Sequence, residues 1–307
     1  MAAAFVRNGA KRVYIASRKL DDLKVVAEQL NKISPNGGSG KGEQRSTLNT
    51  EDSRILTMPI HTDAPVVALQ ADIATKAGCD SLANQIKERE TELDVLINNA
   101  GITWGAPMDD FPEEKGWDKT FHLNVKSQFY LTVALLPLLE KNKSNTKHAS
   151  VINIASTAAI VPNAESGLSA PGHGTWSCKY MYCRVQIDFL VPVSRQWLTF
   201  YSNAPPCSDQ PSKAASVHLT RTMANTLAER FILVNAICPG VFPSRMTSYA
   251  IGENRDILEG VQPTGRLGTA EDIGGLAVFL SSRAASHITG TATVVDGGNS
   301  IQFMPRL

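Results

Sequence analysis

A buried strand that ends in a turn of small residues is the feature that most constrains the fold of this chain. Residues 93–97 read Leu-Asp-Val-Leu-Ile, a nearly continuous apolar run, which is typical of a parallel strand buried on both faces. The strand gives way to Asn98-Asn99-Ala100-Gly101, where Asn tolerates unusual backbone angles and Ala and Gly leave space. Because open parallel sheets bind ligands at the carboxyl ends of their strands, this turn predicts either the floor of a ligand site or an ordinary strand-to-loop connection.

Strand and helix patterns alternate along the rest of the chain. Strands are predicted at 12–16, 66–71, 93–97, 150–155, 231–237 and 291–295, and helices at 2–7, 20–32, 77–89, 118–139, 213–230 and 270–280. This alternation predicts one α/β domain over residues 1–307, with a doubly wound, Rossmann-like parallel sheet in a three-layer α/β/α arrangement. The segments 33–65 and 157–211 lack such periodicity, and loops of that length are unusual in a compact domain.

Composition excludes several classes of protein. The 30 basic and 29 acidic residues balance, so we expect no nucleic-acid partner. No apolar run approaches the roughly 18 residues of a membrane span, and the apolar run at the N-terminus is too short for a secretory signal. The five cysteines are an odd number without metal-type spacing. We therefore expect a reduced, cytoplasmic protein without a metal site.

A series of short motifs follows in a defined order. They are Asp72-Ile73, Asn98-Asn99-Ala100-Gly101, Asn124, Ser156, Ser212-Lys213-Ala214-Ala215, Pro239-Gly240, Pro263-x-Gly265-Arg266-x-Gly268, Glu271-Asp272, Ile288-Thr289-Gly290 and Asp296-Gly297-Gly298. In this order they resemble the short-chain dehydrogenase/reductase family over nearly the whole chain, and most of all its 3-oxoacyl-[acyl-carrier-protein] reductases, including those of rhamnolipid synthesis. Another Rossmann-type enzyme, such as a methyltransferase, does not explain this set.

The resemblance implies an NADP(H)-dependent oxidoreductase. Its reaction would reduce a 3-oxoacyl-like ketone to a secondary alcohol or run in reverse, so its partner would be a small carbonyl or alcohol substrate. The resemblance also implies a homo-oligomer that pairs through helices 118–139 and 213–230.

The family's catalytic group consists of Asn, Ser, Tyr and Lys, and three of these have matches here. Asn124, Ser156 and Lys213 match the Asn, Ser and Lys, although each alone is equally well a buried helix polar residue, a strand-end Ser or a surface Lys. The Tyr position, four residues before Lys213, holds Asp209. An Asp has a reference pKa of about 3.9, and we expect the neighbouring Lys⁺ to lower it further. The alternative function is a catalytically impaired relative that acts as a binding or subunit protein, because both this Tyr and the family's Gly-rich turn are absent.

The resemblance also places a dinucleotide. The family's first strand and the Gly-rich turn that holds the pyrophosphate have no counterpart in this chain, and we expect a misplaced start codon as the cause. At the adenosine end, Arg18 would bind the 2′-phosphate of NADP by its charge and paired hydrogen bonds, with Ser17 beside it. Asp72 and Ile73 would contact the adenine. The open alternatives are a solvated Arg18 and a helix-capping Asp72.

Three further groups would lie along the rest of the cofactor. Asn99, Ala100 and Gly101 would follow the ribose and phosphates, and Lys213 would bond the nicotinamide ribose. Pro239, Gly240 and Val241 would approach the nicotinamide, because glycine permits close backbone contact.

We hypothesise that residues 178–209 are largely a translated intron. Cys178-Lys179-Tyr180 can be encoded TGTAAGTAC, which contains the intron start GTAAGT, and Ser208-Asp209 can be encoded TCAGAC, which contains the intron end CAG. Excision removes 31 codons (209 − 178), keeps the reading frame and creates a Tyr codon before Gln210. The product reads Trp-Ser-Tyr-Gln-Pro-Ser-Lys, which resembles the family's motif. The alternative is a genuine divergent loop.

Sequencing of the mature transcript tests this hypothesis. We expect reads that join the first base of codon 178 to the second base of codon 209. Reads that run continuously through codons 178–209 would contradict the hypothesis.

Overall fold

The computed structural model describes residues 1–33, 66–160, 209–244, 247–260 and 262–301. The predicted insertions at 33–65 and 178–209 lie outside these residues, apart from Ile33 and Asp209. Everything below concerns the described part of the chain.

All the strands run parallel and form two sheets. They are β1 (Val13–Ser17), β2 (Val66–Gln70), β3 (Val95–Asn98), β4 (Ala149–Ile154), β5 (Ile232–Pro239) and β6 (Ala292–Val295). The first two strands pair with each other, and the other four follow in the order β3-β4-β5-β6. Each predicted strand is therefore confirmed, with ends within two residues of the prediction.

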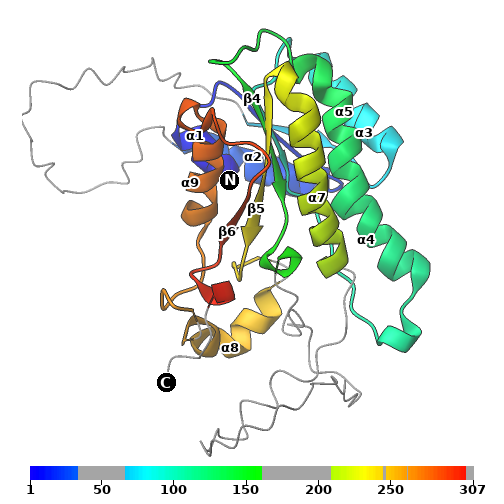
Figure 1. The fold of residues 1–307 in the computed structure, drawn as a ribbon, viewed down its shortest axis with the longest axis vertical. Coiled ribbons are helices and arrows are strands. Elements are labelled where there is room, and N and C mark those ends of the chain that lie inside the picture. Colours follow the sequence, from blue (N-terminus) through cyan, green and yellow to red (C-terminus); the bar gives the residue numbers. More distant parts are fainter. Residues whose placement is uncertain (34–65, 161–208, 245–246, 261, 302–307) are drawn as a thin grey trace, which may run out of the picture.

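Helices cover both faces of the four-stranded sheet (Figure 1). They are α1 (Ala2–Arg7), α2 (Leu20–Asn31), α3 (Lys76–Lys87), α4 (Lys119–Phe121), α5 (Ser127–Leu139), α7 (Asp209–Leu227), α8 (Ser248–Gly260) and α9 (Ala270–Ser281). Side chains of α3, α5 and α7 pack with β3, β4 and β5 in one core, and α1 and α9 pack on the other face. The predicted three-layer α/β/α fold is confirmed. No helix in the described part is long and apolar enough to cross a membrane.

The predicted helix at 118–139 is wrong in one respect, because it is not a continuous α-helix. It begins earlier and contains two π-helical segments, Glu113–Asp118 and His122–Lys126, on either side of α4. Gly116 lies where an added Cβ would come within 2.7 Å of the Phe111 ring and 2.9 Å of the Trp104 ring. These rings therefore need a glycine here. π-Helical turns inside helices occur often at functional sites, and Asn124 lies in the second segment.

The predicted helix at 213–230 begins four residues too late. In the structure α7 begins at Asp209, with Pro211 in its first turn, where a missing N–H costs no helical hydrogen bond. The Ser212 hydroxyl donates to the Asp209 backbone oxygen at 2.7 Å and holds this turn. Asp209 therefore belongs to the helix that carries Lys213.

The sheet is divided between β1 and β3, which are not hydrogen-bonded to each other in the described part of the chain. The pair β1–β2 has its own small core with α1 and α2, formed by Val6, Ala27 and Val66. Arg12, just before β1, and Tyr14 of β1 bind the Glu90 carboxylate, at 2.7 and 2.9 Å, in the segment that precedes β3.

Candidate active site

The side chain of Asn124 joins two chain segments that are far apart in the sequence. Its Oδ1 accepts from the Ile102 backbone N–H at 2.9 Å, and its Nδ2 donates to the Ile102 oxygen at 2.9 Å. The same Nδ2 donates to the Ser212 hydroxyl at 2.9 Å and lies 3.4 Å from Asp209 Oδ1. Asn124 is fully buried, so these bonds satisfy an amide that water does not reach. They hold the turn after β3 against the first turn of α7.

Lys213 lies beside this junction. It is buried, and its Nζ donates to the Ile154 backbone oxygen at 2.9 Å, at the carboxyl end of β4. A Cβ added to Gly101 would lie 3.3 Å from both Lys213 Nζ and Asn124 Oδ1. The turn that follows β3 therefore brings its backbone close to the lysine and the asparagine. Burial lowers the pKa of Lys213, while the Asp209 carboxylate raises it by a smaller amount.

Ser156 lies two residues after β4 and begins a short 3₁₀ turn. Its hydroxyl oxygen accepts from the Ala158 N–H at 3.2 Å. Burial raises the pKa of the Cys238 thiol, in β5, to about 11, although a hydrogen bond with the Ser156 backbone and the Lys213 charge lower it by smaller amounts. The cysteine is therefore a neutral neighbour of Ser156 and Lys213 at physiological pH.

Asp209 occupies a mostly buried position in the first turn of α7. Burial raises the pKa of its carboxyl group, and the Lys213 charge lowers it by a smaller amount. The expectation that Lys213 sets the direction of this shift is therefore wrong, because the cost of removing the carboxylate from water exceeds the attraction of the lysine. The carboxyl group still replaces the phenol that the family resemblance requires at this position.

A buried asparagine pair supports the same edge of the sheet, and the sequence analysis missed its role. Asn98 of β3 donates from Nδ2 to Asn153 Oδ1 of β4 at 2.8 Å, and Asn153 donates to the Thr220 hydroxyl of α7 at 2.9 Å. The residues Asn98 and Asn153 are direct partners in the β3–β4 register. A polar residue inside each of two apolar strands was the sequence signal for this pair. Only the register of the strands shows that the two residues meet.

The close packing of the backbone after β5 explains why position 240 is a glycine. A Cβ on Gly240 would lie 2.6 Å from the Cβ of Asp296, and the Gly240 N–H donates to the Val295 oxygen at 2.9 Å. Pro239 ends β5, and Gly240 and Val241 follow it, at the same carboxyl edge as Asn99–Gly101 and Ser156. Their approach to a nicotinamide stays a prediction.

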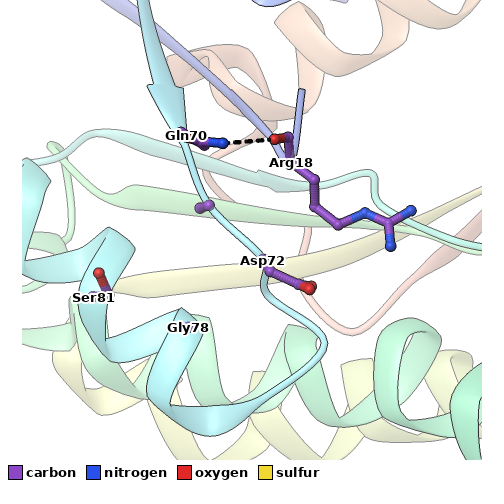
Figure 2. A pocket seen from close by; sticks show the side chains of 6 residues that line it. Arg18, Gln70, Asp72, Gly78 and Ser81 are labelled. Atoms are coloured by element: carbon purple, nitrogen blue, oxygen red, sulfur yellow. Dashed lines mark hydrogen bonds between the residues drawn. The ribbon is translucent and has the colours of Figure 1, made fainter. Parts of the chain in front are cut away.

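A second group of predicted site residues, which includes Arg18 and Asp72, lies at the carboxyl ends of β1 and β2 (Figure 2). A pocket of about 390 Å³ is lined there by Arg18, Gln70, Ala71, Asp72, Gly78 and Ser81. The Arg18 side chain extends along the same side of the pocket as the Asp72 carboxylate (Figure 2). Ser17 ends β1, and its hydroxyl oxygen accepts from the Lys19 N–H at 3.4 Å. Ile73 packs against the main core instead.

The alternative explanation of Asp72 as the helix cap is wrong. Thr75 caps α3, because its hydroxyl oxygen accepts from the Gly78 N–H at 3.1 Å. Asp72 forms a local turn in which Oδ1 accepts from the Ala74 N–H at 3.1 Å. Gly78 is required here because an added Cβ would lie 1.7 Å from the Asp72 backbone oxygen. The structure thus forms two clusters: Asn124, Ser156, Lys213 and Gly101 in one, and Arg18 with Asp72 in the other.

No group of metal-binding side chains occurs among the described residues. The chemistry available at the first cluster is that of a buried amine, an amide and a hydroxyl, with a partly buried carboxyl group beside them. A basic side chain and a carboxylate border an open pocket at the second cluster.

Comparison with known proteins identifies the family. Residues 47–168 match the short chain dehydrogenase model, and residues 208–300 match the model described as Enoyl-(Acyl carrier protein) reductase. The rhamnolipids biosynthesis 3-oxoacyl-[acyl-carrier-protein] reductase of Pseudomonas aeruginosa is 36% identical over 234 residues, which cover 75% of each chain. The 2-dehydro-3-deoxy-D-gluconate 5-dehydrogenase of Bacillus subtilis is 32% identical over 222 residues, 71% of this chain and 68% of that one.

A solved structure agrees with this match. The RhlG/NADP active-site complex of Pseudomonas aeruginosa superposes with a TM-score of 0.67 at 29% identity, over 97% of this chain and 90% of that one. The chain belongs to the short-chain dehydrogenase/reductase family. It is an oxidoreductase by family, and the resemblance drawn from the sequence motifs is confirmed.

The contact between Gly78 and Asp72 gives a testable prediction. Gly78→Ala should destabilise the protein by about 1–3 kcal/mol or more, because the new methyl group overlaps a backbone oxygen. The measurement is urea unfolding followed by circular dichroism. Gly275→Ala on α9 is the matched control, because no heavy atom lies within 4 Å of its added Cβ, and it should gain up to about 1 kcal/mol. Equal stability of the two variants would contradict the Gly78 contact.

Proposed function

We propose that this chain carries the site of an NADP(H)-dependent oxidoreductase that reduces a ketone to a secondary alcohol, or catalyses the reverse reaction. The observation that carries the proposal is the junction of Asn124 with Ile102 and Ser212, which brings Lys213 against Gly101 at the carboxyl edge of the sheet. This edge is where parallel sheets bind ligands.

The residues fit a dinucleotide at two places. The pocket beside Arg18 has the volume and the exposed cation for the adenosine end, including a 2′-phosphate. Gly101 leaves the space next to Lys213 that a ribose hydroxyl would need. NADPH would supply the hydride when bound. The NADP complex of the Pseudomonas relative supports this choice of cofactor.

The roles of the chain's own residues follow from their chemistry. Ser156 would hold the substrate oxygen by its hydroxyl, next to the end of β4. Lys213 would bind the nicotinamide ribose, with its ammonium already anchored on the Ile154 oxygen. Asn124 is a positioning residue, because its amide is occupied with Ile102 and Ser212.

The substrate class rests on similarity alone. A relative named for 3-oxoacyl-[acyl-carrier-protein] reduction supports a 3-oxoacyl-like ketone, and a relative named for a sugar-acid dehydrogenase supports a polar one. We place the 3-oxoacyl class first, because the Pseudomonas reductase is the more similar of these two.

The second candidate is a catalytically impaired relative that serves as a binding or subunit protein. Asp209 favours it, because the family's Tyr is absent from the position beside Asn124 and Lys213. A proton donor contributes roughly 10²–10⁴-fold to a reaction of this kind, so its loss would leave little turnover.

Asp209→Tyr distinguishes the two candidates. We expect NADPH-dependent reduction of β-keto esters to rise roughly 10²–10⁴-fold at saturating NADPH, because the phenol restores the proton donor. Asp209→Phe is the matched control, since it adds the ring without the hydroxyl. No activity in any form would favour the binding protein. Equal rates for the unsubstituted chain and the Tyr variant would show that the proton comes from a group other than residue 209.

Three organisational proposals accompany the function. We place the protein in the cytoplasm, because its five cysteines are an odd number without metal-type spacing. We expect no nucleic-acid partner, because its charge is balanced. We treat 1–307 as one domain with insertions at 33–65 and 178–209. The second insertion is supported by the two family matches, which end at 168 and resume at 208.

We further propose a homo-oligomer that pairs through the predicted helical segments 118–139 and 213–230. Support comes from α5, where Phe129 and Val133 are 41% and 43% exposed one helical turn apart. Val133→Lys should shift the protein to monomers in sedimentation velocity, because a charge would be buried in the contact. Val25→Lys on α2 is the matched control and should leave the assembly unchanged. A monomeric unsubstituted chain would contradict the proposal.

A further inference from the structure

The backbone of Arg18 is held by a side chain beyond the end of the strand ladder. The ladder between β1 and β2 closes with the Ala71 N–H, which donates to the Ser17 oxygen at 3.0 Å. One residue further, Gln70 Nε2 donates to the Arg18 oxygen at 3.0 Å, drawn as the dashed line in Figure 2. The hydrogen bond from the Gln70 side chain therefore holds the backbone of Arg18 itself.

The glutamine is held in turn from α3. Gln85 Nε2 donates to the Gln70 backbone oxygen at 3.3 Å. Gly78 and Ser81 of the same helix line the pocket. Two hydrogen bonds, each donated by a glutamine side-chain amide, thus link α3 through Gln70 to Arg18.

This link matters because the guanidinium of Arg18 has little else to orient it. The side chain is exposed, and within the described residues no carboxylate forms an ion pair with it. The strand that precedes it, β1, has no ladder to the four-stranded sheet in the described part. The direction of the side chain therefore depends on where its backbone is held.

We propose that Gln70 is a positioning residue that sets the preference for a 2′-phosphorylated nucleotide by fixing Arg18 at the rim of the pocket. This inference rests on the proposed function, which assigns Arg18 to the 2′-phosphate of NADP. Gln70 itself binds no phosphate in this scheme, because its amide N–H is occupied by the Arg18 oxygen. Its effect is limited to ligands that carry the 2′-phosphate.

The test compares two nucleotide fragments on the full chain by isothermal titration calorimetry. Adenosine 2′,5′-bisphosphate carries the 2′-phosphate and AMP lacks it. The readout is the affinity for the bisphosphate divided by the affinity for AMP. Gln70→Met keeps the length of the side chain but removes the donor. We expect this ratio to fall about three- to tenfold, as for the loss of one hydrogen bond, while AMP binding stays within about twofold. Gln29→Met on exposed α2 is the matched control and should leave the ratio unchanged.

A double-mutant cycle with Arg18→Ala separates positioning from direct contact. If Gln70 acts through Arg18, Gln70→Met should change the ratio no further in the Arg18→Ala background. A further fall of the same size would overturn the positioning role, as would an unchanged ratio in the single Gln70→Met variant. Equal affinity of the unsubstituted chain for both fragments would overturn the NADP assignment itself, and the inference with it.

Discussion

The candidate active site depends on one buried amide. Asn124 uses both its oxygen and its nitrogen on Ile102 and reaches Ser212 with the same nitrogen. The turn after β3 and the first turn of α7 come from segments more than 80 residues apart in sequence, and this side chain is what bonds them directly. Its place in a π-helical segment follows the same requirement, since the local widening of a helix changes the direction of a side chain. Lys213 is positioned next to Gly101 as a consequence.

Most of the fold could be predicted from the sequence, because apolar runs and caps are local signals. The helix predicted at 270–280 is one example, and in the structure Thr269 caps α9 with a reciprocal bond to Asp272. The π-helical segments could not be predicted, since they accompany the packing of two aromatic rings on Gly116. The Asn98–Asn153 pair could not be predicted either, because the register of two strands 50 residues apart is set by the whole sheet. At the site, residue types and order gave Asn124, Ser156 and Lys213, whereas their contacts required the structure.

Burial decides the electrostatics of Asp209 and Lys213. From the sequence, a carboxylate four residues before a lysine favours two charged groups that strengthen each other. In the structure the pKa of the carboxyl group is raised and that of the amine is lowered, in both cases chiefly by desolvation. Each charged form is thus less favoured than in water, although each group partly stabilises the other. A phenol at position 209 would avoid this cost, because it is neutral at physiological pH. The site therefore suits a tyrosine better than the aspartate it holds.

The division of the sheet places the candidate catalytic side chains and the arginine beside the pocket on two different groups of strands. The groups suited to chemistry lie on the four-stranded sheet and α7, whereas Arg18 lies on the pair β1–β2. The helix α3 connects the two parts, because Cys79 and Leu82 pack in the main core while Gly78 and Ser81 line the pocket beside Arg18. A rigid helix anchored in a core transmits position better than an exposed strand end. The placement of the pocket beside Arg18 relative to the candidate catalytic cluster therefore depends on α3, and the Gln85–Gln70–Arg18 link extends that placement to the arginine.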